Sequence, residues 1–437
     1  MKIDRRSFLK TSALAAMTAH AGKAAAMLPS EQAAWNKWES TAIPRPEDIL
    51  ASSPMLQCPT PDSMGVAFSV NALSAGFAEV ADNPEMKDSR RIEAEGVPIM
   101  PTDDRVHLIR MTGLKPGTRY WYRVGAASLA HPVGYWTKQS EIVWSAVHSF
   151  TTPGESAPSH FAMMSDTHAE YGQMARMTAK YRSLGAPFVV WNGDVARSKM
   201  NDRDDLVKNF IELPENDGYA SDAAIVFNSG NHDYRGDYAW KLSEVIMPRP
   251  SSERTGRFEH LVRNFAFRAG EIALIGLDTG EDKPDRHPSF GGLARFGKYR
   301  ELQAEWLKDQ FNRPEIAKAP YIVAFVHIPI FDKDPNANPG NVLEDYAEWQ
   351  ADCAALWGPT LAKNGVQLVM AGHTHQYRFD PATAERPWAQ LVGGGRGAKT
   401  YQTVIDCRVD GGKLVADVWN TDSDTLVASH RFDPRSC

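Results

Sequence analysis

The chain has 437 residues, and 43% of them are hydrophobic, which is enough for more than one buried core. Its formal net charge of −6 gives no basic footprint for a nucleic-acid backbone. Beyond the N-terminal residues, no segment has the length and hydrophobicity of a transmembrane helix, so we expect no integral membrane segment in the mature protein.

The N-terminal residues predict export. Asp4, Arg5 and Arg6, with the apolar stretch that follows through Ala19, resemble a twin-arginine signal peptide. The stretch is too short and too polar to span a bilayer stably. We therefore predict a signal peptide over residues 1–26, passage through the twin-arginine export machinery, and a mature protein that is periplasmic or secreted.

Residues 42–152 have the pattern of a small all-β sandwich. Short alternating runs are separated by turn residues and show no helical period. The segment 114–124 resembles the late hairpin of fibronectin type III domains, in which a tyrosine packs at the corner of the sandwich. Residues 151–156 are the expected linker to a second domain over residues 153–437.

The second domain is predicted to be α/β. Five short apolar runs have the length of strands, and the stretches between them are long enough for crossover helices. The runs are residues 161–164, 188–191, 224–227, 321–325 and 366–370. Such runs indicate buried, largely parallel strands, and segments within residues 404–432 are expected to complete a second sheet.

A polar motif follows each of the five runs. The motifs supply Asp166 and His168, Asp194, Asn231 and His232, His327, and His373 and His375. Open α/β sheets bind ligands at the carboxyl ends of their strands, so we expect these side chains to converge. Imidazole and carboxylate donors suit zinc, manganese or iron, and two such cations need a shared anionic ligand between them, for which Asp194 is the natural candidate.

The ordered motifs resemble the calcineurin-like metallophosphoesterases. The resemblance implies a four-layer domain with two mixed sheets flanked by helices, and two divalent metal ions. It assigns Asp166, His168, Asp194 and His375 to one metal and Asp194, Asn231, His327 and His373 to the other. It also implies that His232 assists the leaving oxygen, with Asp233 orienting its imidazole.

A sandwich ahead of such a domain resembles the purple acid phosphatase layout, with two departures. In that family the first motif lacks its histidine, and a tyrosine after the bridging aspartate binds iron. Here His168 and Arg197 stand at those two positions. The chain therefore predicts phosphoester chemistry without a purple iron–tyrosinate centre, and the metals stay open among manganese, zinc and iron.

The rim of the site is expected to choose the substrate. Arg197 and Arg235 are the candidates to bind phosphate oxygens through a guanidinium fork. The loops 280–297 and 331–341 are expected to line the same cleft. Four cysteines, Cys58, Cys353, Cys407 and Cys437, are compatible with one or two disulfides, and their pairing stays open.

We therefore predict hydrolysis of a phosphoester small molecule by a metal-bridging hydroxide, with phosphomonoesters as the favoured substrates. A phosphodiesterase that acts on a cyclic nucleotide or a phospholipid headgroup is one alternative. An exported binding module whose sandwich contacts a surface polymer is the other.

Overall fold

The computed structural model describes residues 27–94, 98–196, 199–213, 217–332, 346–395 and 401–435. They divide into two compact units. The small unit consists of residues 27–44 and 129–140, and the large unit contains the other described residues.

The small unit pairs one helix with one hairpin. Helix α2 (Pro29–Ser40) ends against Lys138, whose Nζ donates to the carbonyl oxygens of Trp38, Glu39 and Thr41 at 3.0, 2.7 and 2.7 Å. The indole Nε1 of Trp38 donates to the carbonyl of Thr137 at 3.1 Å. The last carbonyls of a helix have no partner within the helix, so a cation at that end stabilises it.

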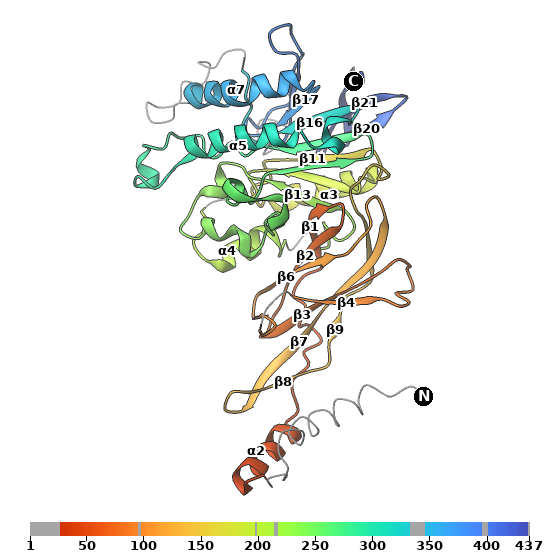
Figure 1. Cartoon of the computed structure of the whole chain (residues 1–437), viewed down its shortest axis with the longest axis vertical. Helices are drawn as coiled ribbons and strands as arrows, with labels where there is room; N and C mark the ends of the chain where they lie inside the picture. Colours follow the sequence, from red (N-terminus) through yellow and green to blue (C-terminus); the bar gives the residue numbers. More distant parts are fainter. Residues whose placement is uncertain are drawn as a thin grey trace. The chain divides into compact units, whose positions relative to one another are not determined.

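The described strands form three sheets (Figure 1). The first has the order β22 (Thr425–Phe432), β21 (Lys413–Asn420), β20 (Thr403–Asp410), β11 (His160–Met164), β12 (Phe188–Asn192), β13 (Ala224–Asn228), β1 (Met55–Thr60), β2 (Ser63–Ser69) and β6 (Val106–Thr112). The second has the order β14 (Phe265–Ala269), β15 (Ile272–Gly276), β16 (Tyr321–Phe325), β17 (Leu368–Ala371), β19 (Ala389–Val392) and β18 (Arg378–Asp380). The third has the order β10 (His148–Thr151), β7 (Arg119–Val133), β3 (Ser74–Ala81) and β4 (Arg90–Glu93), with β5 (Thr102–Asp103) on β3 and with β8 (Trp136–Gln139) and β9 (Val143–Trp144) on β7.

Helices cover the outer faces of the first and second sheets. In the large unit the α-helices are α3 (Tyr171–Leu184), α4 (Arg203–Phe210), α5 (Phe296–Gln310), α6 (Pro314–Ala317) and α7 (Tyr346–Lys363). The short 3₁₀ helices are η1 (His232–Tyr234), η2 (Ala239–Glu244), η3 (Ser251–Glu253), η4 (Gly256–Phe258) and η5 (Pro288–Phe290). Figure 1 shows α5 and α7 beside β16 and β17.

The layers follow from the alternation of side chains along each strand. In β12, Phe188 and Val190 face the second sheet, where Phe267 and Val323 belong to the same core. The alternating residues Val189 and Trp191 point the other way, into a core with α3 and α4. Successive strand residues point to opposite faces, so an apolar run buries both faces at once. The predicted four-layer α/β domain is confirmed.

All five predicted runs are strands, but they do not share one sheet. Strands β11, β12 and β13 are parallel neighbours in the first sheet, whereas β16 and β17 are parallel neighbours in the second. The C-terminal segments are strands as well, yet the expectation that they complete a second sheet is wrong. Strand β20 pairs antiparallel with β11 and so extends the first sheet.

The N-terminal β region shares a sheet with the catalytic region. Strand β1 pairs in parallel with β13, at Gln57 opposite Ile225, and Tyr122 of β7 donates from its hydroxyl to the carbonyl of Ser221 at 2.8 Å. The described residues from β1 to β10 form strands and no α-helix, so the predicted N-terminal all-β domain is confirmed. Near the expected corner, the amide of Lys115 donates to the hydroxyl of Tyr120 at 3.0 Å.

The cysteines within the described residues form no disulfide. Cys58, Cys353 and Cys407 are free and buried, and burial raises the pKa of Cys353 to about 12. Cys437 lies outside the described residues. Within the described part of the chain, no helix has the length and apolar character needed to cross a bilayer.

His107 makes the stability of the N-terminal β region depend on pH. It is only 3% exposed, its Nε2 lies 3.0 Å from Ser74 Oγ, and burial lowers its pKa to about 4, with Arg203 adding to the shift and Asp103 opposing it. Between pH 6.5 and 4 the unfolded chain therefore binds a proton that the folded chain does not, so stability falls as the pH falls.

We expect this loss to reach about 3 kcal/mol by pH 4. It should be largely absent in His107→Leu when the free energy of unfolding is measured by denaturant titration at pH 7, 5.5 and 4. The control His260→Leu, at an exposed position, should keep the wild-type dependence. Identical pH profiles for His107→Leu and wild type would contradict the account.

Candidate metal centre

The predicted ligands lie just beyond the ends of five strands. Asp166 and His168 follow β11, Asp194 follows β12, Asn231 and His232 follow β13, His327 follows β16, and His373 and His375 follow β17. Because β11, β12 and β13 belong to the first sheet and β16 and β17 to the second, each sheet supplies part of one site. The structure brings all of these residues together.

The turns that carry them have an unusual backbone. Positive φ angles occur at Asp166 (55°), His168 (48°), Asp194 (54°), His373 (69°) and His375 (55°). Residues other than glycine seldom adopt this conformation, which costs about 1–3 kcal/mol and persists only where the surrounding structure holds it. Here the amide of Asp166 donates to the carbonyl of Gly193, and that of His168 to the carbonyl of Asp194, both at 3.0 Å.

Two glycines let the turns approach each other closely. A Cβ on Gly230 would lie 2.3 Å from the amide nitrogen of Asp194 and 2.4 Å from its Oδ1. A Cβ on Gly193 would lie 2.5 Å from His327 Nδ1. No side chain fits at either position, so the absence of a Cβ is what allows Asp194 and His327 to meet.

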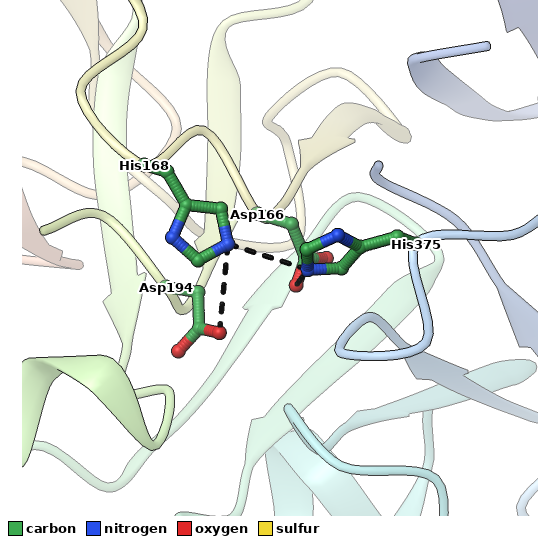
Figure 2. Close-up of side chains that lie close together, drawn as sticks. All are labelled: Asp166, His168, Asp194 and His375. Carbon is green, nitrogen blue, oxygen red and sulfur yellow. Dashed lines mark hydrogen bonds and ion pairs between the residues drawn. The ribbon is translucent and has the colours of Figure 1, made fainter. Parts of the chain in front are cut away.

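One group of donors consists of Asp166, His168, Asp194 and His375 (Figure 2). His375 Nε2 lies 3.3 Å from Asp166 Oδ1 and 3.3 Å from His168 Nε2, and His168 Nε2 lies 3.8 Å from Asp194 Oδ2. One donor atom from each residue can be chosen so that all lie within 4.8 Å of one another. Two carboxylates and two imidazoles at these distances form a site that one divalent cation fits.

A second group consists of Asp194, His327 and His373. His327 Nε2 lies 3.3 Å from Asp194 Oδ1, and Asn231 joins the group through its Oδ1, which lies 2.9 Å from His373 Nδ1. Asp194 belongs to both groups and presents a different oxygen to each of them. Two overlapping donor groups with one shared carboxylate are the arrangement of a dinuclear centre.

The carboxylates and imidazoles of the site shift one another's pKa values. Burial opposes ionisation of Asp166 and Asp194, but the neighbouring imidazoles outweigh it and lower the pKa of both carboxyls. Burial likewise disfavours a charged His327, but Asp194 and Asp166 outweigh it and raise its pKa to about 10. Burial and the charge of His327 lower the pKa of His373 to about 4.

One buried atom shows that the donors fit a metal. His327 Nδ1 lies 2.7 Å from the carbonyl oxygen of Asn192, which requires that Nδ1 carries the proton. Its Nε2 is buried, has no hydrogen-bond partner and lies 3.3 Å from Asp194 Oδ1, so it can bind a metal once its proton has left. A carbonyl that fixes the tautomer of a histidine in this way is the usual support of a metal ligand.

Asp233 does not orient the His232 ring, so that prediction is wrong. Its two carboxylate oxygens accept hydrogen bonds from four backbone amides, those of Asp194, Val195, Ala196 and Gly230, at 2.8–3.3 Å. Burial and the charge of Asp194 raise its pKa to about 6. Asp233 thus fixes the backbone that delivers Asp194.

The His232 ring is held by Arg235 instead. Arg235 Nη1 lies 2.9 Å from His232 Nε2, and His232 Nδ1 has no hydrogen-bond partner. The predicted phosphate fork of Arg235 is occupied, because its Nε and Nη2 bind Glu281 at 2.5 and 3.4 Å and its Nη2 binds Asp282 at 3.3 Å. Burial lowers the pKa of His232 to about 4, so its ring is neutral.

Glu281 and Asp282 were missed by sequence reasoning. They lie in the loop expected to line the cleft, but acidic residues in a loop carry no signal of the arginine they bind. Arg197 lies outside the described residues, as does most of the segment 331–341.

The comparisons with known proteins agree with this geometry. Residues 159–377, about half of the chain, match the family model described as calcineurin-like phosphoesterase, and residues 53–152 match the one described as the purple acid phosphatase N-terminal domain. The chain therefore belongs to the calcineurin-like phosphoesterase family. It combines that domain with a purple acid phosphatase-like N-terminal domain.

Individual relatives are more distant. Purple acid phosphatase 15 of Arabidopsis thaliana is 23% identical over 300 residues, which are 63% of this chain and 49% of the relative. The chain thus spans about half the length of that curated relative. Two solved structures share the fold: purple acid phosphatase PPD1 from yellow lupin (Lupinus luteus) seeds and PhoD. The lupin protein is 14% identical, with a TM-score of 0.63, over 88% of this chain and 75% of its own. PhoD is 13% identical, with a TM-score of 0.60, over 90% of this chain and 94% of its own.

Gly230→Ala should disrupt the centre. Its Cβ would overlap Asp194, so we expect the shared carboxylate to move and the purified protein to hold fewer than two metal ions per chain, with a loss of about 2 kcal/mol in stability. Metal analysis and thermal unfolding measure both effects. Gly358→Ala in α7, where a Cβ meets nothing within 4 Å, is the control and should retain the wild-type metal content. A Gly230→Ala protein with two metals bound at wild-type affinity would contradict the role of Gly230.

Proposed function

We propose that the protein is an exported dinuclear-metal phosphoesterase that acts mainly on phosphomonoesters. The observation that carries the proposal is the pair of largely buried donor groups that share Asp194. The family match supports the same chemistry. A module that only bound a surface polymer would have no need of this intact donor set.

The proposed ligands follow the two donor groups. Asp166, His168, Asp194 and His375 would hold one metal, and Asp194, Asn231, His327 and His373 would hold the other. When bound, two divalent cations supply Lewis-acid chemistry, lower the pKa of a water molecule and orient a phosphate. Manganese, zinc and iron all suit these nitrogen and oxygen donors.

Residues of the chain would supply the rest. His232 lies next to the shared carboxylate, its backbone amide donating to Asp194 Oδ1 at 2.8 Å, which places its ring to assist the leaving oxygen. Arg235 would position that ring and place a positive charge behind it. Asp233 would keep the turn of Asp194 in place.

We also propose the organisation predicted from the sequence: a twin-arginine signal peptide over residues 1–26, a β-sandwich over 42–152 and a catalytic domain over 153–437. Residues 53–152 match a separate family model, which supports a boundary between the β-sandwich and the catalytic domain at residue 152. Secretion of a fusion between residues 1–26 and a reporter, and its loss on replacing Arg5 and Arg6 by lysine, would test export.

Asp194→Asn should lower kcat for p-nitrophenyl phosphate by at least about two orders of magnitude, because it removes the charge that both metals share. Treatment of the wild type with a chelator should have the same effect, and added manganese, zinc or iron should reverse it. Asp410→Asn, at the exposed end of β20, is the control. Full activity in metal-free protein would refute the proposed function.

Monoesters and diesters can be separated directly. We expect kcat/KM for p-nitrophenyl phosphate to exceed that for bis(p-nitrophenyl) phosphate by about tenfold or more, since a site that pairs with a substrate oxygen rejects an analogue in which that oxygen is blocked. The reverse order would assign the protein to the phosphodiesterases and leave the metal chemistry intact.

A further inference from the structure

A cavity of about 940 Å³ lies beside the metal centre. Arg235 and Glu281 line it, and Arg235 is also the residue that holds His232. One wall continues from Arg235 to Trp240, and another comes from the segment that begins at Glu281 and runs into α5. The cavity is therefore linked to the candidate metal centre through Arg235, which lines it and contacts His232.

The cavity is much larger than a phosphate group needs. Ligand pockets usually have volumes of about 300–1,000 Å³, so this one is at the upper end. The phosphate itself would sit on the donors of the metal centre. The space thus remains for the alcohol part of the substrate.

Aromatic and apolar side chains dominate the walls. Tyr234 and Phe296 pack edge to face with ring centroids 5.3 Å apart, and Phe290 packs against Phe296 at 5.4 Å. At the rim, Trp240 is 76% exposed and Leu293 is 86% exposed. Large apolar side chains left in water beside a catalytic cavity are typical of a surface that a ligand covers.

Four of the five lysines and arginines that line the cavity bind groups of the protein, and Lys199 is the fifth. Arg235 and Lys283 both bind Glu281, at 2.5 and 3.3 Å. Arg295 donates to two backbone carbonyls, and Arg263 donates to Ser229 Oγ at 3.0 Å. A highly charged leaving group would have to compete with these contacts for the cations, whereas a flat ring would find several aromatic partners.

We propose that this cavity binds the leaving group of the substrate, and that the leaving group carries a planar aromatic ring that packs against Trp240. A nucleoside and an aryl alcohol share this chemistry. The inference rests on the proposed phosphoesterase function of the adjoining metal centre.

Kinetics with three substrates test it: adenosine 5′-monophosphate, 1-naphthyl phosphate and ribose 5-phosphate, which lacks a ring of this kind. We expect both aromatic esters to have a higher kcat/KM than ribose 5-phosphate. In Trp240→Ala the ratio of kcat/KM for each aromatic ester to kcat/KM for ribose 5-phosphate should fall about tenfold. The fall should come through KM, since stacking on an aromatic side chain contributes about this factor to binding. Trp240→Phe should keep most of the ratio.

Tyr135→Ala is the matched control, because Tyr135 is 88% exposed but lies in the hairpin between β7 and β8. It should leave the ratio unchanged. A fall for only one of the two aromatic esters identifies which ring the cavity takes. An unchanged ratio in Trp240→Ala would overturn the inference while leaving the phosphoesterase intact.

Binding separates this inference from the proposed function. Calorimetry should detect adenosine or 1-naphthol binding to metal-free wild type, weakened about tenfold in Trp240→Ala. Trp240-dependent binding without hydrolysis of any phosphoester by the metal-loaded protein would support the cavity and refute the proposed function. Hydrolysis of phosphoesters without any Trp240-dependent binding would support the proposed function and refute the role of the cavity.

Discussion

The carboxylate of Asp194 is the contact on which both halves of the metal centre depend. One of its oxygens faces His168, and the other faces His327 and the amide of His232. A carboxylate buried so deeply is stable only with positive charge around it. Its position is fixed by Asp233, which binds the amides of Asp194 and of the two residues that follow it.

The second constraint is the contact between the two sheets. Asn192, at the end of β12, donates to the carbonyl of Val326 beyond β16 at 2.8 Å and accepts from His327 Nδ1 at 2.7 Å. Asn228, at the end of β13, donates to the carbonyl of Leu277 at 3.3 Å. These bonds lie beneath the donors, so the ligands from one sheet are held in register with those from the other. The aromatic core between the sheets supports the same alignment.

Backbone strain is concentrated where function needs it. Five predicted ligand positions have positive φ angles. The neighbouring Gly193 and Gly230 leave no room for a side chain. Such conformations cost free energy that the rest of the fold must offset. The cost is consistent with an architecture in which four layers and buried apolar strands hold a few short turns in place.

The sequence by itself determined the strands, the ligand types and their order, because apolar runs and the polar motifs after them are local patterns. It predicted Asp166, Asp194 and His375 as ligands, and the structure brings these three side chains together. It misjudged Asp233 and the fork of Arg235, and it did not indicate Glu281 as a partner. Only the tertiary structure decided these points, since hydrogen-bond partners far apart in the chain are chosen by the packing of two sheets, which no local pattern records.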